Sequence, residues 1–298
     1  MPAPTSPARA EIRGFFDDAT SSLTYLAWDA ETRQAAIIDP VLGFDPSNGK
    51  TSLAPLAPIL NEAEKRGLHV VWILETHVHA DHLSAAAYAR AATKAPVAIG
   101  EHVVEVQKIF GPVFNAADVS RDGDEFDRLL PDGARLPLGD LYIEVWHTPG
   151  HTPACVTYRV GDAAFVGDTL FMPDYGTARA DFPGGDARTL YRSIRRIFGL
   201  PGETRLFMCH DYKAPGRDHY AWETTVAEQR RANIQAHDGI DEDSFVAVRQ
   251  ARDRDLAAPR LLLPSIQVNI RAGHFPPAEA DGRRYLKIPL QEPVETAG

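Results

Sequence analysis

Four short apolar runs in this chain lead directly into histidine or aspartate, and this feature restricts the folds open to it. The first run, V-V-W-I-L at 70–74, leads into T-H-V-H-A-D-H at 76–82. The others lead into T-P-G-H at 148–151, G-D at 167–168 and C-H-D at 209–211. Short apolar runs bounded by turn residues predict buried strands. We therefore expect a fold that brings four strand ends, and the polar side chains that follow them, to one point.

Strand-like and helix-like segments are interleaved along the chain. Strands are predicted at 23–28, 34–40, 70–74, 96–99, 141–146, 155–160, 163–166 and 205–208. Helices are predicted at 53–66, 83–93, 101–109, 187–198, 222–236 and 244–252. Gly67 is expected to end the first helix, and Asp186 to cap the fourth. This order predicts an α/β (α+β) fold, a sandwich of two mixed β-sheets with helices outside.

No short repeat or low-complexity linker divides the chain, so we expect one domain over residues 1–298. Its core is expected at about 15–236, with a C-terminal extension at about 237–298 packed on it. From Ala257 onward the sequence is rich in proline and is expected to be extended.

Composition excludes several classes of function. The 298 residues are 44% hydrophobic and carry a formal net charge of -10, which disfavours binding to nucleic acid or anionic lipid. No apolar run is long enough to span a bilayer, and Met1–Arg13 shows no secretory signal. The two cysteines are too few for a disulfide framework. We expect a cytoplasmic protein without nucleic-acid or membrane partners.

The segment 76–82 is the strongest functional signal. His77, His79, Asp81 and His82 fall within six residues, directly after a predicted buried strand. Metal sites need several neutral imidazoles and a carboxylate converging on one point, and a strand end followed by a tight turn can present them together. A polar loop that happens to be rich in histidine is the alternative. The pattern H-x-H-x-D-H at a strand end favours the metal site.

Three weaker signals supply candidate ligands from distant parts of the chain. His151 follows a Pro-Gly turn, Asp168 follows an apolar strand, and His210 follows another. Taken alone, His151 is a weak signal because many turns contain a histidine, and Asp168 is better explained as an ordinary turn aspartate. Their recurrence at strand ends supports one shared metal site.

The order H-x-H-x-D-H, T-P-G-H, G-D and a late histidine resembles that of the metallo-β-lactamase superfamily over about residues 15–236. The resemblance implies an αββα sandwich with the site at one edge. In the dinuclear hydrolases of this fold, residues matching His77, His79 and His151 bind one metal. Those matching Asp81, His82 and His210 bind the second metal, and the residue matching Asp168 bridges the two.

The flanking segments resemble the persulfide dioxygenases (sulfur dioxygenases), in the longer form typical of bacterial members. The similar segments are G-H-T-P-A-C-V-T-Y at 150–158, F-V-G-D-T-L-F at 165–171, M-P-D-Y-G-T-A-R-A-D-F-P-G-G at 172–185, T-L-Y-R-S-I at 189–194, L-P-G at 200–202 and H-D-Y at 210–212. The resemblance implies one Fe(II) per chain held by His77, His151 and Asp168. His79, Asp81, His82 and His210 would then surround the iron ligands, or alternatively complete a site for two Zn(II) ions.

The resemblance to the persulfide dioxygenases implies oxidation of glutathione persulfide by O₂ to sulfite and glutathione. Candidate catalytic residues are Asp81, His82, His210, Arg179 and Tyr212. Candidate contacts to the glutathione part are Arg179, Tyr212, Lys213 and Arg217. Solvated loop charge is the alternative for Lys213 and Arg217, and simple aromatic packing is the alternative for Tyr212.

Two rival functions stay open. A dinuclear zinc hydrolase of the glyoxalase II type would cleave glutathione thioesters with metal-bound hydroxide. A non-catalytic redox or sulfur-binding protein would use Cys155 and Cys209, although both thiols read mainly as small core residues. The bacterial resemblance implies a bacterial cytoplasm, and a homodimer is one assembly that the sequence leaves open.

Overall fold

The strands predicted at 23–28 and 34–40 pair antiparallel within the first of two large sheets. The computed structural model describes residues 9–291. Residues 1–8, part of the segment where no secretory signal was expected, lie outside the described residues, as does the end of the C-terminal extension at 292–298. The first sheet has the order β1-β2-β3-β6-β8-β9. Its strands are β1 (Glu11–Asp17), β2 (Ser22–Trp28), β3 (Gln34–Ile38), β6 (His69–Glu75), β8 (Val97–Gly100) and β9 (Arg128–Leu130).

The second sheet packs against the first and has the order β10-β11-β12-β13-β14-β15. Its strands are β10 (Arg135–Leu138), β11 (Leu141–His147), β12 (Val156–Val160), β13 (Ala163–Phe165), β14 (Arg205–Phe207) and β15 (Glu223–Thr225). Both sheets are mixed, since β3, β6, β8 and β9 run parallel in the first and β13 and β14 in the second. A small third sheet joins β4 (Val41–Asp45), β5 (Lys50–Ser52) and β7 (Leu83–Ser84).

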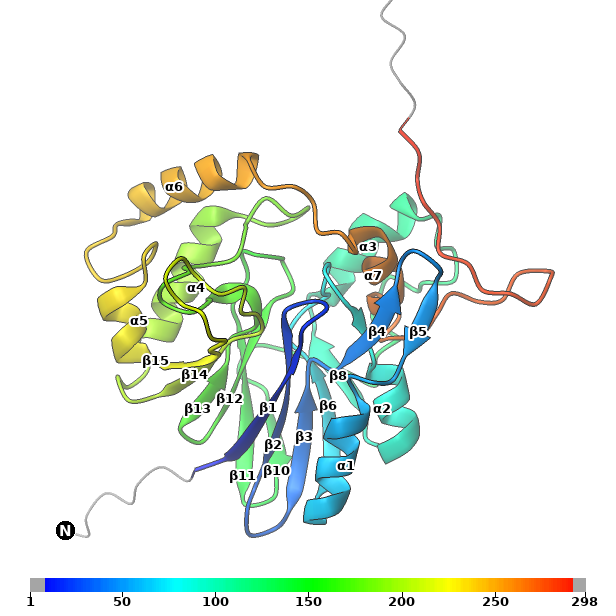
Figure 1. The fold of residues 1–298 in the computed structure, drawn as a ribbon, viewed down its shortest axis with the longest axis horizontal. Coiled ribbons are helices and arrows are strands. Elements are labelled where there is room, and N and C mark those ends of the chain that lie inside the picture. Colours follow the sequence, from blue (N-terminus) through cyan, green and yellow to red (C-terminus); the bar gives the residue numbers. More distant parts are fainter. Residues whose placement is uncertain (1–8, 292–298) are drawn as a thin grey trace, which may run out of the picture.

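Helices cover the outer faces of both sheets, which confirms the predicted αββα sandwich (Figure 1). On the side of the first sheet lie α1 (Ala57–Arg66), α2 (Ala86–Thr93) and α3 (Val103–Val113). On the side of the second lie α4 (Ala187–Phe198), α5 (Val226–Ala232) and α6 (Glu242–Arg254). Gly67 ends α1 with φ 63, and the Asp186 side chain accepts a hydrogen bond from the Thr189 amide at the start of α4, as predicted.

The core consists of three apolar layers. The inter-sheet layer contains Leu23, Tyr25, Leu74, Val145 and Tyr158. Alternate residues of the same strands face the helices on either side, so the central strands are buried on both faces. The histidines lie at the strand ends, beyond these apolar layers.

Two sequence-based expectations in the C-terminal third are wrong. The helix predicted at 222–236 is shorter, because β15 pairs with β14 before α5 begins. The tail from Ala257 is not wholly extended, since it contains α7 (Leu262–Asn269), which packs against β7. Pro264 lies in the first turn of α7, where a missing backbone N–H removes no helical hydrogen bond.

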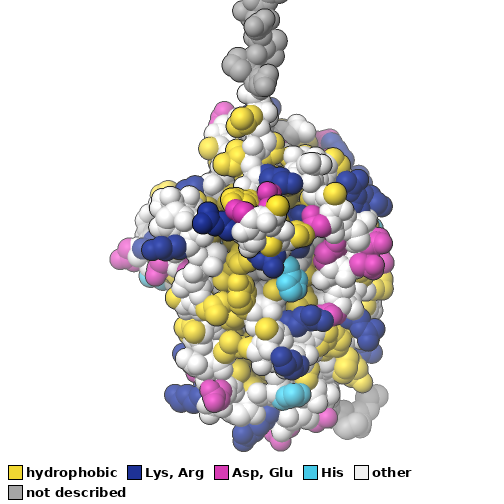
Figure 2. Space-filling view, turned by 90° about the vertical axis from the view of Figure 1, so that its right-hand side faces the viewer, with side chains coloured by type: hydrophobic (Ala, Val, Ile, Leu, Met, Phe, Trp, Pro, Cys, Tyr) yellow, Lys and Arg dark blue, Asp and Glu magenta, His cyan; other side chains and the backbone are white. Residues whose placement is uncertain are grey.

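Charged and apolar side chains are mixed on the surface of the molecule. Figure 2 views the side of the molecule that lies on the right in Figure 1, and acidic and basic side chains are interspersed there with apolar ones. Within residues 9–291, every helix is too short or too polar to cross a bilayer.

Candidate metal centre

Hydrogen bonds to the Asp39 carboxylate fix the loop that carries the first motif. Asp39 directly follows β3 and adopts a positive φ of 52, which aspartate tolerates better than most residues. Its carboxylate accepts hydrogen bonds from the Thr76 amide at 2.7 Å and the Thr76 hydroxyl at 2.9 Å. The Nε2 atom of His79 lies 3.0 Å from the same carboxylate. The neighbouring strand end thus holds the start of the histidine loop in place.

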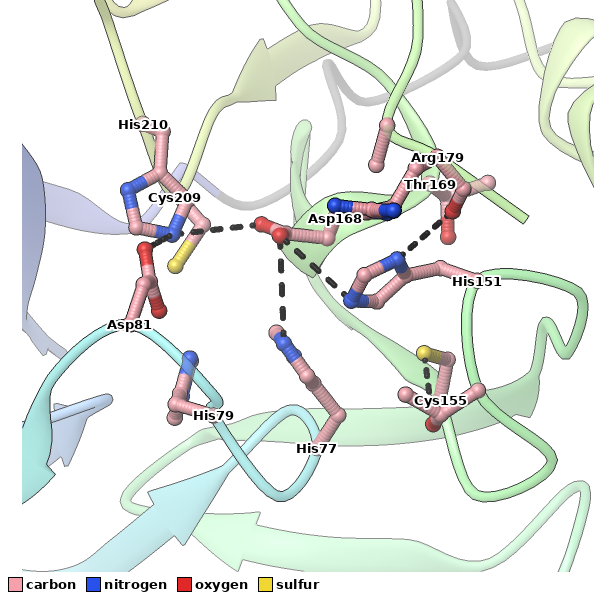
Figure 3. A network of polar contacts seen from close by, with 12 residues as sticks. His77, His79, Asp81, His151, Cys155, Asp168, Thr169, Arg179, Cys209 and His210 are labelled. Carbon is pink, nitrogen blue, oxygen red and sulfur yellow. Dashed lines mark hydrogen bonds and ion pairs between the residues drawn. The ribbon is translucent and has the colours of Figure 1, made fainter. Parts of the chain in front are cut away.

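His151 is positioned by the Pro-Gly turn after β11. Gly150 has φ 137, and a Cβ there would lie 2.3 Å from the backbone of Leu190, so only glycine fits this turn. The Nδ1 atom of His151 lies 2.8 Å from the carbonyl oxygen of Arg179 and therefore carries the proton. Nε2 is left free to face Asp168 (Figure 3).

His77, His151 and Asp168 form one group of candidate ligands. The Asp168 Oδ2 atom lies 3.9 Å from His77 Nε2 and 3.7 Å from His151 Nε2. Asp168 sits in a short 3₁₀ turn directly after β13. Two imidazoles and a carboxylate from three separate strand ends converge here, within ligand range of one ion.

A second group lies beside the first. His210 Nε2 is 3.1 Å from Asp81 Oδ2 and 3.4 Å from Asp168 Oδ1, so Asp168 faces both groups (Figure 3). His79 and His82 complete this group. His82 Nδ1 is 3.1 Å from the Ser22 hydroxyl, which leaves its Nε2 atom free.

The chemistry of these side chains fits a metal cluster. Two of their buried nitrogen atoms, His79 Nδ1 and His82 Nε2, make no hydrogen bond. His210 Nε2 and Asp168 Oδ1 also make none, and their contacts are ion pairs within the cluster. Burying such atoms without partners is costly, and a cation removes the cost. The residues brought together at this point therefore form a metal-binding His/Asp cluster.

Electrostatics favour the ligand-competent form of His77 and Asp81. Burial lowers the pKa of His77, and the surrounding imidazoles lower it further, so this ring is neutral at pH 7. Burial opposes ionisation of Asp81, but His210 and His82 more than offset it and hold its pKa below the ordinary value.

At His79 and His210, burial opposes protonation, but the Asp39 and Asp81 carboxylates more than offset it and raise the pKa of both imidazoles. Burial also raises the pKa of Glu75, at the end of β6, to about 7.

A cavity of about 350 Å³ leads to the cluster, a size typical of small-molecule sites. Five predicted site residues line it: Asp81, His151, Asp168, Arg179 and Tyr212. The Arg179 guanidinium is already paired with Asp181 and donates to the Ala257 carbonyl.

Lys213 and Arg217, predicted to contact substrate, do not line this cavity. The Lys213 ammonium lies 4.5 Å from the ring centroid of Tyr220. Arg217 makes paired hydrogen bonds to the carboxylates of Asp211 and Asp174. It thereby ties the loop after β14 to the loop that carries Tyr175.

Both cysteines are buried and lie outside the cavity lining. Burial raises the pKa of the Cys155 thiol to about 12 and also raises the pKa of Cys209. Thiols in this state are poor nucleophiles, which favours a packing role for both.

The family model described as "Metallo-beta-lactamase superfamily" matches residues 17–210. The chain belongs to the metallo-β-lactamase superfamily. Members similar to it carry different names. A "Probable metallo-hydrolase" of Burkholderia pseudomallei is 54% identical over 94% of this chain and 98% of that protein. "Glyoxylase B2" of Dictyostelium discoideum is 45% identical over 95% and 97%.

Similarity to persulfide dioxygenases is more distant. The human mitochondrial persulfide dioxygenase ETHE1 is 30% identical over 88% of each chain. The crystal structure of ETHE1 from Myxococcus xanthus has a TM-score of 0.71 and 30% identity, and the match covers 89% of this chain and all of that one. The resemblance to this branch of the metallo-β-lactamase superfamily is thus supported by both sequence and fold.

Two residues that support the cluster of this metallo-β-lactamase fold were missed in the sequence. Asp39 had a signal, since it follows the apolar run A-A-I-I, as the predicted ligands follow theirs. Asn269, on α7, had none. Its side chain donates to the carbonyls of His79 and His82 and accepts from the Ser84 amide, each at 2.8 Å. The C-terminal extension therefore holds the histidine loop directly.

Proposed function

We propose that this chain is an Fe(II)-dependent persulfide dioxygenase that acts on glutathione persulfide. In the balanced reaction, one persulfide, one O₂ and one water give one thiol, one sulfite and two protons. The sulfane sulfur is oxidised, O₂ is reduced, and the S–S bond breaks. The observation that carries the proposal is the group of His77, His151 and Asp168, two of which line the cavity.

Two histidines and one carboxylate are the donor set typical of non-haem iron oxygenases. Iron held by these three residues would supply the O₂ chemistry and leave positions open for O₂ and the persulfide sulfur. The chain itself contributes orientation, since the Arg179 carbonyl holds the His151 ring and Asp39 holds the histidine loop. Asp81, His82 and His210 would form hydrogen bonds beside the iron ligands and would donate or accept protons there.

Tyr212 is proposed as a wall of the substrate site. Its ring stacks on His210 with an interplanar angle of 8° and lines the cavity. Arg179 is proposed to form the part of the wall beside His151, whose ring its carbonyl holds. Its guanidinium is already paired with Asp181, through Nε and Nη2. Any contact of Arg179 with substrate therefore uses the guanidinium N–H groups that do not bond Asp181.

A specific observation also favours a second candidate, a dinuclear zinc hydrolase of glutathione thioesters. The two oxygens of Asp168 face two adjacent groups, with Oδ2 toward His77 and His151 and Oδ1 toward His210. That arrangement suits a carboxylate bridging two metals. The similarity to a protein named "Glyoxylase B2" points the same way.

Metal analysis and O₂ uptake separate the two candidates. Protein purified without oxygen is expected to contain about one iron per chain and to consume O₂ in step with glutathione persulfide. We expect this protein to show little hydrolysis of the thioester S-lactoylglutathione. Two zincs per chain, with thioester hydrolysis and no O₂ uptake by the iron-loaded protein, would reject the dioxygenase.

A further inference from the structure

The outer wall of the cavity comes from the C-terminal extension. The segment between α6 and α7 crosses over the strand ends in Figure 1 and contributes Leu256, Ala257, Pro259 and Leu261 to the lining. The end of α6 contributes Arg249 and Arg252, and the crossing segment contributes Arg260. The cavity thus has ligands of the metal cluster at its inner end and guanidinium groups on the wall that the C-terminal extension forms.

These arginines differ in what they bind. Arg249 is buried and paired with Asp253, and Arg179 is paired with Asp181. Arg252 and Arg260 form no ion pair and donate no side-chain hydrogen bond within the part of the chain that the structure describes. Arg252 is half-buried, and its guanidinium lies 5.5 Å from the ring centroid of Tyr175, which limits where it can point.

Within the described residues, two guanidinium groups that form no ion pair thus line one cavity. The carboxylates that line the cavity, Asp81 and Asp168, belong to the metal cluster at the inner end. Two parallel N–H groups of a guanidinium form a fork that matches the two oxygens of a carboxylate in shape and charge. The hydrogen bonds between them are stronger when the guanidinium is partly removed from water.

We propose that Arg252 and Arg260 form a subsite for the carboxylate groups at the end of the substrate remote from its sulfur. The subsite would select a thiol carrier with carboxylates, such as glutathione, over a neutral one. This inference rests on the proposed function only in placing a thiol-borne substrate in this cavity, and it does not depend on the reaction or on the number of metals.

The test compares two ligands that share a thiol. Glutathione and its diethyl ester are titrated into the holoenzyme by calorimetry without oxygen. Glutathione is expected to bind roughly tenfold or more tightly than the ester, because charge-assisted hydrogen bonds are lost with the carboxylates. The preference is expected to shrink at high salt, since Arg260 is exposed.

Variants locate the effect. In R252Q/R260Q, glutathione is expected to bind roughly as weakly as the ester binds wild type, while ester binding stays unchanged. Arg254→Gln is the matched control, since Arg254 lies on the same helix and outside this cavity. Arg252→Lys keeps the charge but not the fork, and is expected to fall between wild type and the double variant.

Equal binding of glutathione and ester by wild type overturns the subsite, even if no variant folds. Equal glutathione binding by wild type and R252Q/R260Q also overturns it, as does a wild type that fails to bind glutathione. Persulfide-dependent O₂ uptake is measured on the same samples. Arginine-dependent glutathione binding without O₂ uptake would leave the subsite standing and reject the dioxygenase.

Discussion

The inner and outer parts of the cavity are built in different ways. The inner part is a cluster of side chains that follow the ends of four strands. A turn of a few residues after each strand positions the side chains of the cluster. The outer wall is the end of α6 and the segment that crosses from it to α7. Long-range contacts hold this region, such as those of Arg179 to the Ala257 carbonyl and of Arg271, after α7, to Asp118. The fold therefore fixes where a metal would bind, and the extension shapes what reaches it.

The largest effect is expected inside the cluster, where His151→Ala should abolish both metal binding and activity. His210→Ala should leave iron bound and lower activity by about 10–100-fold, as is typical for groups beside the ligands. Metal content of protein purified without oxygen, measured together with O₂ uptake, checks both variants. His219→Ala removes an exposed imidazole and serves as control. Equal metal loss in the first two variants would instead indicate that both groups bind metal.

Asn269→Leu tests whether the inner part depends on the outer. The change leaves the carbonyls of His79 and His82 and the amide of Ser84 without their partner. Unmade buried hydrogen bonds cost about 1–3 kcal/mol each, so we expect a loss of about 3 kcal/mol or more in the free energy of unfolding. Metal should also dissociate more readily to a chelator. Both are measured by urea unfolding and chelator competition.

Gln267→Leu is the matched control for Asn269. Gln267 lies on the same helix but bonds the carbonyls of Leu263 and Lys287, not the histidine loop. It should lower stability and leave chelator resistance unchanged. If Asn269→Leu also leaves chelator resistance unchanged, the cluster is independent of the extension.

The smallest expected effect concerns the ion pair between Asp118 and Arg271, which ties the end of α7 to the loop after α3. Hydrogen bonds from Arg271 hold the pKa of Asp118 below its ordinary value. The stability from such a depressed carboxyl pKa is present above the unfolded-state value of about 3.9 and is lost as the pH falls through the folded-state pKa. Wild type should therefore exceed Asp118→Asn in stability at pH 7, and the gap should close below about pH 4.

Urea unfolding at a series of pH values measures this gap. Asp124→Asn, an exposed neighbour, is the control and should show little gap at any pH. A gap for Asp118→Asn that is constant from pH 7 to the acid limit would show that the hydrogen bonds, rather than the charge, stabilise this end of the extension.

Most of the cluster was predictable from the sequence because its determinants are local. Three histidines and an aspartate within 77–82 need only a strand end and a turn to converge, and the Pro-Gly turn at 149–150 fixes His151. The alternation of apolar runs with amphipathic segments likewise determined the two sheets and the helices outside them. Because the central strands are buried on both faces, the charged and metal-ligating side chains of the cluster lie beyond the strand ends.

Only the tertiary structure decided which groups support and surround that cluster. Asn269 bonds carbonyls 190 and 187 positions away, and nothing in its own segment marks it. Arg217 resembled a substrate contact by its nearness to His210, but Asp211 and Asp174 take up its guanidinium. Arg252 and Arg260 belong to no motif, yet the end of α6 and the crossing segment after it bring them to the cavity. The local sequence determines the secondary structure and hence the direction in which a side chain points. The partners of that side chain depend on packing between segments that lie far apart in the chain.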